Sequence, residues 1–510
     1  MYTLSFEDIQ SILINSNQLR ETVHNGQWHY QVKDEDLLEE TFNSITYNSK
    51  SASEGSLFIC KGEKFKVDYL NEAVKQGVQF YVSEKYYEGV EATGFIVNDI
   101  REVMALIARE FYNRPDEKMK IIGITGTKGK TTTAYLLKNI LEAYQPEKTG
   151  IISTIEVILD GKTSLASQLT TPEAMDLYRM LAQASDNGME NLVMEVSSQA
   201  YKMKRVHGMT FDIGIFLNFS PDHIGPNEHP TTEDYFYCKS RLILDSKVSV
   251  LQSSLDNIEY LKEISKTAGN NYVVYGSKDE VNDYAYTNVE GSRKQFNIVS
   301  EGTDDLKLNG SYQINMLGDF NKENALSAAI ASSTLGVDQE SIRKGIEMTQ
   351  VSGRMEHYTY GNNHIYVDFA HNYISLKILF DYLVEEHPDH ELVILLGAPG
   401  NKGISRRKDM GKVLSMYEGE VILVEDDPNF ENVRDISEQI AKHIDGPIQV
   451  SFNDNREDAV QSTLKKLNPK SKKVVVLAAK GSDRYMLRQG VKEDYSGDDG
   501  LVKQFLGLYD

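Results

Sequence analysis

Cysteine is scarce in this chain, because Cys60 and Cys238 are the only two among 510 residues. Two distant cysteines provide neither a disulfide framework nor the paired spacing of a zinc site, and they suit a reducing compartment. The first residues also lack the basic segment followed by an apolar one that is typical of a secretory leader. We therefore expect a cytoplasmic protein.

The chain also has fewer positive than negative residues, and it lacks long apolar runs. The chain has 54 Lys and Arg residues against 76 Asp and Glu residues, which gives a net charge of −22. This charge argues against a general nucleic-acid binder, which needs a broad basic face, although a local basic cluster can still bind a small anion. Val474–Ala479 is among the longest apolar runs and is far too short for a membrane span. We expect no nucleic-acid partner, no membrane span and a monomer.

The most informative stretch runs from Ile121 to Thr133 and reads IIGITGTKGKTTT. Its apolar start predicts a buried strand, a glycine-rich turn follows, and apolar residues then recur at helical spacing up to Tyr144. A strand, a glycine loop and a helix in this order form a phosphate cradle, because backbone N–H groups close around oxygens at a helix N-terminus. Lys130 would reach the β- and γ-phosphates of a nucleotide, and the Thr131 hydroxyl suits Mg²⁺.

The match to a phosphate loop is a shortened one, since Ile124 stands where the full pattern has its first glycine. The alternative is a glycine-rich turn with a solvated lysine. The strand before the loop and the helix after it favour the phosphate loop.

A chain of 510 residues exceeds one hydrophobic core, and its strand and helix patterns fall into three series. We predict an α/β fold of three domains: an N-terminal substrate domain over 1–116, a central P-loop-type nucleotide-binding parallel sheet over 117–350, and a C-terminal Rossmann-like α/β domain over 351–510. Residues 256–307 are polar and weakly periodic, so no element is assigned there. Strands are predicted at 56–60, 78–82, 95–97, 121–124, 192–196, 211–217, 365–368, 392–396, 421–424 and 474–477, and helices at 67–76 and 100–112.

Polar residues follow several of these strands, at the sheet edge where α/β folds bind ligands. Glu195 ends an apolar strand, and a buried carboxylate needs a cation or hydrogen-bond donors. Taken singly, His223 reads as a core histidine and Lys239 as a surface charge. Together with Lys130, Thr131 and Glu195 in one nucleotide domain, they indicate a site for Mg²⁺ and ATP.

The motifs and their order resemble those of the Mur ligases, the ATP-dependent amide-forming enzymes of peptidoglycan precursor synthesis, and above all those that add the third peptide residue. The matching segments are spread over all three regions of the chain. They are Asn48–Lys50, Gly126–Thr132, Thr170–Pro172, Met194–Ser198, Arg205–Gly208, Asn218 with Asp222–His223, Lys239, Gly318–Asn321 with Asn324, Gly353–Glu356, Asp368–His371, Asp426–Asn429 and Lys480–Asp483.

The resemblance implies a role for each matching residue. Catalysis would depend on Lys130, Glu195, His223 and Lys239, and two Mg²⁺ ions would be held by Thr131, Glu195, His223 and the carbamate that CO₂ forms on Lys239. Ser49 would hold the uridine end of the nucleotide substrate, and Thr170, Thr171, Ser197 and Arg205 its muramoyl-peptide. ATP would be bound by Gly126, Thr127, Lys128, Gly129, Lys130, Thr131, Thr132, Asn321, Asn324, Arg354, Asp368 and His371.

The implied reaction is a two-step amide synthesis on UDP-N-acetylmuramoyl-L-alanyl-D-glutamate. The substrate carboxylate takes the γ-phosphoryl group of ATP to give an acyl phosphate, and the amine of an amino acid then displaces phosphate. One domain must close over ATP, so we expect hinges near 115–120 and 350–353.

The identity of the incoming amino acid depends on Asp426, Asp427, Pro428 and Asn429, which occupy a family motif, and on Asp483. In the family, Asp-Asn-Pro-Arg accompanies meso-diaminopimelate, because the arginine binds its additional carboxylate. Asn429 offers no such cation, whereas the three carboxylates suit an ammonium, so L-lysine is the predicted substrate. The alternatives are meso-diaminopimelate or another amino acid, with the motif serving only as a turn.

Some positions depart from the family pattern, notably Gln199 in place of histidine and Met203 in place of glutamine. Two other functions remain open. The first is a folate polyglutamylating ligase on the same scaffold, which the roughly 115 residues ahead of the phosphate loop and Ser49 argue against. The second is a P-loop nucleotide-binding module that forms no amide, and such a module would not need Lys239 and Arg354.

Overall fold

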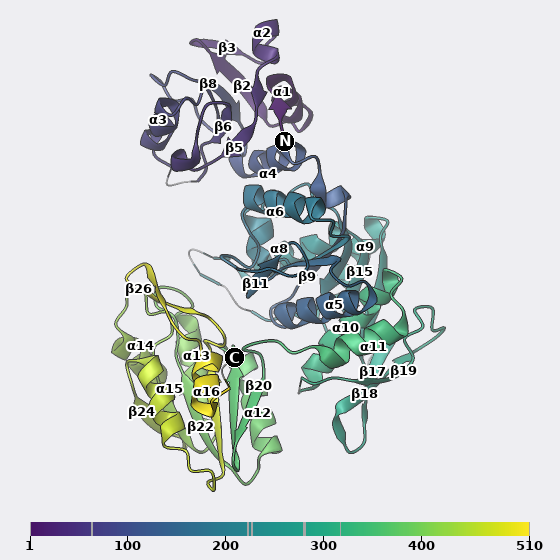
Figure 1. Ribbon diagram of the computed structural model, residues 1–510, viewed down its shortest axis with the longest axis vertical. Coiled ribbons are helices and arrows are strands. Elements are labelled where there is room, and N and C mark those ends of the chain that lie inside the picture. Colours follow the sequence, from purple (N-terminus) through teal and green to yellow (C-terminus); the bar gives the residue numbers. More distant parts are fainter. Residues whose placement is uncertain are drawn as a thin grey trace.

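The computed structural model describes residues 2–62, 65–221, 224–225, 228–278, 282–316 and 318–508. These residues form three α/β units, each around its own main sheet, arranged one after another along the chain (Figure 1). The fold is therefore the predicted three-domain α/β class, while the domain borders at 116/117 and 350/351 stay predictions. His223 and the neighbouring Asp222 lie outside the described residues.

The N-terminal unit is built on a six-stranded sheet of order β3-β2-β8-β7-β6-β5. Strands β5 to β8 are parallel and have apolar residues on both faces, as expected of a sheet covered on both sides. The elements are β1 Leu4–Ser5, α1 Phe6–Asn15, β2 Leu19–His24, β3 Gln27–His29, α2 Glu35–Leu38, β4 Thr41–Phe42, β5 Ser44–Thr46, β6 Ser56–Ile59, α3 Val67–Lys75, β7 Phe80–Ser83, β8 Thr93–Val97 and α4 Ile100–Phe111, with short 3₁₀ turns at Ser49–Ser51 and Pro115–Glu117.

The middle unit carries an eleven-stranded sheet of order β12-β11-β10-β13-β9-β14-β15-β16-β17-β18-β19. The strands from β10 to β17 pair in parallel, and antiparallel strands complete both edges. The elements are β9 Lys120–Thr125, α5 Lys130–Tyr144, β10 Thr149–Ile152, β11 Glu156–Ile158, β12 Ser164–Ala166, α6 Ala174–Asp186, β13 Asn191–Glu195, α7 Ser198–Lys202, β14 Phe211–Phe216, α8 Thr232–Leu244, β15 Ser246–Gln252, α9 Ile258–Thr267, β16 Asn271–Ser277, β17 Tyr284–Val289, β18 Ser292–Ser300, β19 Gly310–Gln313, α10 Asp319–Thr334 and α11 Gln339–Met348.

The third unit has a six-stranded sheet of order β20-β21-β25-β22-β23-β24, parallel except for the edge strand β20. A separate hairpin, β26-β27, follows it. The elements are β20 Glu356–Tyr360, β21 Asn363–Asp368, α12 Tyr373–Glu386, β22 Glu391–Leu396, α13 Ser405–Leu414, β23 Glu420–Leu423, α14 Val433–Ala441, β24 Gln449–Phe452, α15 Arg456–Lys465, β25 Lys473–Ala478, β26 Tyr485–Arg488, β27 Val491–Asp494 and α16 Asp498–Leu506.

One apolar cluster joins the first two units, which also have clusters of their own, whereas the buried clusters of the third unit consist of its own residues. A continuous cluster runs from Phe6 in α1 through Met104 in α4 to Leu177 in α6, so α4 packs directly on α6. In the third unit, separate clusters cover the two faces of the sheet. Among the described helices, none is long and apolar enough to cross a membrane.

All the predicted strands are present, with borders shifted by at most two residues, and the three predicted helices are present as α3, α4 and α5. The segment 256–307, to which no element was assigned, holds α9, β16, β17 and β18. Its strands lie toward one edge of the sheet, where many of their side chains are exposed or partly exposed, and this exposure accounts for the weak apolar pattern.

Candidate functional site

The phosphate loop lies between the end of β9 and the start of α5, as predicted. Gly126 and Gly129 have φ values of 152° and 83°, a region that favours glycine. A Cβ on Gly129 would also lie 2.6 Å from the Asn324 Oδ1 atom on α10. The Lys130 ammonium donates to the backbone oxygens of Gly126 (2.8 Å) and Thr127 (3.3 Å) and so caps the loop.

Asn218, at the carboxyl end of β14, holds this loop in place. Its Oδ1 accepts from the Lys128 backbone N–H (2.9 Å), and its Nδ2 donates to the Lys128 carbonyl (3.1 Å). Thr127 adds a second link, because its hydroxyl donates to the Ser220 carbonyl (3.1 Å) and accepts from the Ser220 N–H (3.0 Å). The sequence indicated that Asn218 follows a strand, but it did not predict these hydrogen bonds to the loop.

Glu195 is buried beside the loop, since β13 pairs in parallel with β9 and places Glu195 opposite Ile124. Its carboxylate accepts three hydrogen bonds, from the Thr131 hydroxyl (2.9 Å), the Thr154 N–H (2.8 Å) and the Thr154 hydroxyl (3.1 Å). The prediction that this carboxylate needs donors is confirmed. Thr154 was missed, because it follows a short strand that the sequence did not reveal.

Lys239 projects from α8 to the same loop. It is buried, its ammonium donates to the Gly126 carbonyl (2.7 Å), and it lies 4.7 Å from the centre of the Tyr235 ring. Lys130 and Lys239, which are far apart in the sequence, therefore meet at one backbone oxygen. The Thr132 side chain is buried in the first turn of α5.

A hydrogen-bonded chain that the sequence did not predict links α7 to the start of α8. His229 is fully buried; its Nδ1 lies 2.6 Å from Asp234 Oδ2, and its Nε2 lies 2.8 Å from the Ser198 hydroxyl. The Lys202 ammonium lies 3.2 Å from the same Asp234 carboxylate. The chain fixes the N-terminus of α7, which directly follows Ser197, against the helix that carries Lys239.

The four residues expected to contact the muramoyl-peptide lie together. Thr171 donates to the Glu195 carbonyl (2.9 Å), the Ser197 N–H donates to Thr171 Oγ1 (3.0 Å), and Arg205 donates to the Thr171 carbonyl (3.0 Å). Thr170 joins them to the Glu195 network, with its hydroxyl 3.0 Å from that of Thr154.

Glu173 connects this group to the N-terminal unit. It pairs with Arg205 (2.6 Å) and with Lys61 (2.6 Å). Burial acts to raise the pKa of Glu173, but the two cations outweigh burial and lower it. Lys61 lines a cavity of about 530 Å³ together with Tyr47, Phe65 and Met203. Arg205 was predicted as a substrate contact, whereas Glu173 and Lys61 were not predicted.

Ser49 lies in the N-terminal unit, apart from this group. Its side chain is buried and donates to Glu72 on α3 (2.9 Å).

The third unit brings a second set of predicted ATP residues to the phosphate loop. Asp368, at the carboxyl end of β21, accepts from the backbone N–H groups of Met355 and Ala370, both at 2.7 Å. Burial raises the pKa of Asp368, while the nearby cations Arg354 and Lys128 oppose the rise. Lys128 belongs to the phosphate loop, so the two units face each other here.

The remaining predicted ATP residues line the same region. Arg354 stacks over the Phe369 ring at 4.4 Å, and His371 Nδ1 lies 2.7 Å from the Phe369 carbonyl. Asn321 and Asn324 are buried on the first turns of α10, with Asn324 Nδ2 3.4 Å from Asn321 Oδ1. A cleft of about 520 Å³ between the units is lined by residues of both, among them Ser220, Glu228, Tyr373, Arg406 and Lys412.

The predicted acidic cluster forms, but it already surrounds a cation of this chain. The buried Lys480 ammonium lies 2.7 Å from Asp427, 3.6 Å from Asp483 and 3.8 Å from Asp426. Burial acts to lower the pKa of Lys480, but the three carboxylates outweigh it and raise the pKa. Burial raises the pKa of Asp426 and of Asp483.

Asn429 stabilises the loop beside the hairpin β26-β27. Its N–H donates to the Leu487 carbonyl (2.9 Å), and its Oδ1 accepts from the Gly490 N–H (3.0 Å). Pro428 packs against Gly400, where a Cβ would lie 1.8 Å from the Pro428 carbonyl oxygen. The segment is therefore a turn in structure, with acidic side chains projecting from it.

Comparisons with known proteins agree with this arrangement. Two family models match the chain: Mur ligase middle domain over residues 124–332, and Mur ligase, glutamate ligase domain, over residues 353–481. A relative from Enterococcus faecalis (strain ATCC 700802 / V583), named UDP-N-acetylmuramoyl-L-alanyl-D-glutamate--L-lysine ligase, is 45% identical over 507 residues, covering 99% of each chain.

Solved structures share the fold at lower identity. A structure of UDP-N-acetylmuramoyl-L-alanyl-D-glutamate--2,6-diaminopimelate ligase covers 99% of both chains, with a TM-score of 0.65 and 22% identity. A Mycobacterium tuberculosis folylpolyglutamate synthase complexed with ADP and AMPPCP covers 80% of this chain and 96% of its own, with a TM-score of 0.61 and 17% identity. The family models and the full-length identity lead to one conclusion: this chain belongs to the Mur ligase family.

Proposed function

We propose that this chain is an ATP-dependent ligase that joins L-lysine to the glutamate of UDP-N-acetylmuramoyl-L-alanyl-D-glutamate, a step of peptidoglycan precursor synthesis. The main support for the proposal is the 45% sequence identity between this chain and the Enterococcus faecalis relative named as such a ligase, over 99% of each chain. The sites described above support it, because they bring a phosphate loop, a cluster of hydroxyls with an arginine, and an acidic pocket into one molecule.

In this proposal the γ-phosphate of ATP binds at the phosphate loop. Lys130 exchanges its contact with the Gly126 carbonyl for phosphate oxygens, and backbone N–H groups at the start of α5 supply further donors. The glutamate carboxylate of the muramoyl substrate attacks the γ-phosphorus, and the bond to ADP breaks. The amine of the amino acid then attacks the acyl carbon, and phosphate leaves.

The residues beside the loop fit a magnesium ion. Thr131 and Glu195 provide a hydroxyl and a carboxylate 2.9 Å apart, and oxygen ligands are those that Mg²⁺ prefers. Bound there, Mg²⁺ would supply positive charge for the phosphates of ATP. Glu195 would be held for this role by its two hydrogen bonds from Thr154. The proposal also includes His223 as a ligand, and this assignment rests only on the match of His223 to the family motif.

Lys239 fits the same proposal as a carbamate. Its amine lies at the phosphate loop and reaches the Gly126 carbonyl, so an added carboxylate group would place anionic oxygens beside this loop. Carbamate formation converts the amine and CO₂ into an anion and releases one proton. The anion suits a second Mg²⁺, which an ammonium would repel.

The third unit would supply the amino-acid pocket. Asp426, Asp427 and Asp483 carry three negative charges, of which the Lys480 ammonium balances one. The distal ammonium of L-lysine would reduce the remaining charge, whereas the distal end of diaminopimelate adds a carboxylate. No arginine stands at position 429 to bind that carboxylate.

The test is a screen for ADP formation with paired substrates. Purified protein is given ATP, Mg²⁺ and either UDP-N-acetylmuramoyl-dipeptide or a folate glutamate, each with L-lysine, meso-diaminopimelate or L-glutamate. The proposal expects ADP and phosphate only with the muramoyl-dipeptide together with L-lysine. Turnover with a folate would favour the polyglutamylating ligase, and nucleotide binding without turnover on any pair would favour a binding module.

A further inference from the structure

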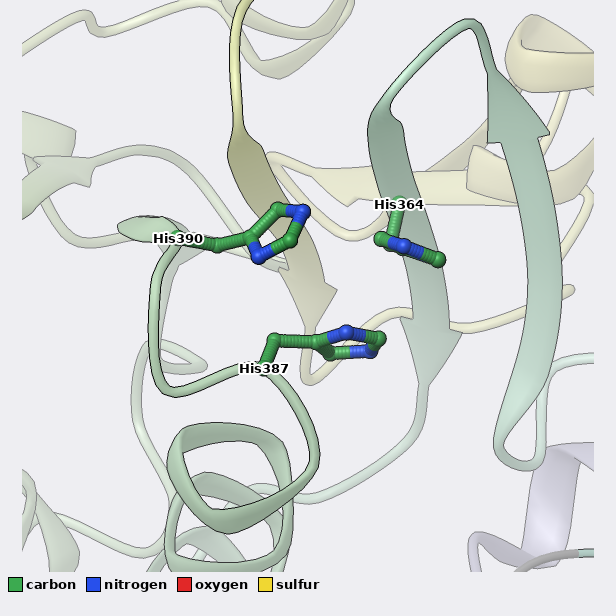
Figure 2. A group of neighbouring side chains, drawn as sticks. All are labelled: His364, His387 and His390. Carbon is green, nitrogen blue, oxygen red and sulfur yellow. The ribbon is translucent and has the colours of Figure 1, made fainter.

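Four of the chain's eleven histidines gather in the third unit, at the end of the sheet away from the phosphate loop. Figure 2 shows three of them pointing toward one space: His364 from β21, His387 from the end of α12, and His390 from the loop that leads to β22. One ring nitrogen from each lies within 4.8 Å of the others. The fourth, His357 on β20, stacks beside His364 with the ring centres 5.2 Å apart.

Each of the three imidazoles uses one nitrogen for a contact outside the cluster. His390 Nε2 lies 3.0 Å from the Asn362 carbonyl, His387 Nε2 lies 2.8 Å from the Tyr366 hydroxyl, and His364 Nδ1 lies 2.9 Å from His357 Nε2. Histidines that bind metals show this pattern, in which an outer hydrogen bond orients the ring and selects the tautomer.

His390 gives the most direct indication of a ligand. A carbonyl oxygen only accepts hydrogen bonds, so His390 Nε2 must carry the proton, and in the neutral ring Nδ1 keeps a lone pair. This Nδ1 atom is buried and has no hydrogen-bond partner among the described residues. A buried acceptor without a partner is costly in a folded protein, and a bound cation would satisfy it.

The chemistry of the three ligands selects the class of metal. Imidazole nitrogens suit Zn²⁺, Cu²⁺ and Ni²⁺, whereas Mg²⁺ prefers oxygen ligands. Zinc–nitrogen bonds of about 2.0–2.1 Å in a tetrahedral site place two ligand nitrogens about 3.3 Å apart. The separations of up to 4.8 Å are longer than this, and the rings of His364 and His387 are stacked with their centres 4.0 Å apart, so metal binding would draw the nitrogens together and turn these two rings out of the stack.

We propose that His364, His387 and His390 form a binding site for one divalent transition-metal ion of the zinc class, separate from the ATP site. Three nitrogens and a water molecule would complete a tetrahedron. His364 is the second residue of β21, and Asp368 at the ATP site is the last, so the two sites are about 13 Å apart along the strand.

The site would tie together three segments of the third unit near its contact with the middle unit. Glu386, directly before His387, pairs with Arg293 from β18 of the middle unit. The metal would thus fix the end of α12 at the place where β18 meets it. This role does not depend on the proposed amino-acid substrate.

The experiment measures zinc binding to the full chain without a histidine tag and without nucleotide. Chelator-treated protein is titrated with ZnCl₂ by equilibrium dialysis, and CoCl₂ is used in parallel because tetrahedral Co²⁺ absorbs visible light. The variants are His390→Ala, His364→Gln and Tyr366→Phe. His443→Ala, a partly exposed histidine of the same unit, is the matched control. Circular dichroism verifies the fold of each variant.

Wild type and His443→Ala should each bind one ion at this site. His390→Ala and His364→Gln should bind it at least about 100-fold more weakly and should lose the cobalt absorption of the site. Tyr366→Phe, which removes only the outer contact of His387, should weaken binding by about 10-fold. An ion bound by the separate group His229, Asp234 and Cys238 would bind equally to wild type and to every variant, so the result is the difference in bound metal and in absorbance between wild type and each variant. Equal stoichiometry and affinity in wild type, His390→Ala and His364→Gln would overturn the proposal.

Discussion

Replacing Lys480 with methionine tests the acidic cluster of the third unit directly. Methionine keeps most of the apolar length of the side chain and removes the ammonium that lies 2.7 to 3.8 Å from Asp427, Asp483 and Asp426. Removing one partner of a buried ion pair costs about 3–5 kcal/mol, because the other charge is left uncompensated. Asp483 is partly exposed and contributes less, so we expect a loss near the lower end, about 3 kcal/mol.

The loss should depend on pH in a defined direction. Burial already raises the pKa of Asp426 and of Asp483, and removal of the ammonium raises both further. A carboxyl group whose pKa is higher in the folded state than in the unfolded state binds protons more strongly when folded. Its contribution to stability is therefore lost as the pH rises through the folded pKa. The variant should lose more stability at pH 8 than at pH 5.5.

Hydrogen exchange is the suitable assay, because a chain of three units does not unfold in one transition. The free energy of opening is read from the amides of β25 and β26, including the Leu487 amide, which donates to Asp427. Lys492→Met is the control, since Lys492 is exposed and also lies over the Tyr485 ring. A loss below about 1 kcal/mol, or one that does not change with pH, would refute the view that these carboxylates are held together by Lys480.

Four further outcomes are expected. Lys130→Ala should abolish ADP formation while leaving uridine-nucleotide binding intact, measured by calorimetry, and near wild-type turnover would remove the phosphate-loop assignment. Lys239→Ala should cripple turnover, with partial recovery on adding short carboxylic acids; ¹³CO₂ labelling of a fully active wild type that detects no carbamate would contradict this. In competition at equal concentration, wild type should use L-lysine in preference to meso-diaminopimelate, Asn429→Arg should weaken lysine use, and a wild-type preference for diaminopimelate would refute the acidic-pocket reasoning. Arg456→Leu should lower the stability of the third unit by about 3–5 kcal/mol, since its buried guanidinium pairs with Asp498 at 2.7 Å, and the double variant with Asp498→Leu should recover most of the loss.

Ten strands, nearly all of them in the parallel parts of the sheets, were predictable because each is a short apolar run that is largely buried. Lys120–Thr125 and Lys473–Ala478 are examples, with only their first residue accessible. The strands Asn271–Ser277 and Ser292–Ser300, in the outer half of the middle sheet, were not predictable in this way. Their exposed positions carry polar side chains, and their pairing depends on partners distant in the sequence.

The candidate site also has features that one segment of the sequence reveals and features that depend on contacts between distant segments. The phosphate loop is contained in one segment, so its residues and their order identify it. Three other contacts join segments that are distant in the sequence. They are the hydrogen bonds of Asn218 with Lys128, of Thr154 with Glu195, and of Lys239 with Gly126. Such contacts follow from the order of strands in the sheet, which no single segment of the sequence specifies.

The acidic cluster shows how a turn and a binding pocket can use the same residues. Asp427 and Asn429 have φ values of 48° and 52°. The hairpin that follows Asp483 holds both residues, because the Leu487 N–H donates to the Asp427 carboxylate and the Leu487 carbonyl accepts from the Asn429 N–H. The turn therefore does not compete with a role in specificity, because it is what aims Asp426 and Asp427 at Lys480. With one ammonium among three carboxylates, the cluster keeps a net negative charge. A second ammonium can be attracted to it, and a free carboxylate cannot.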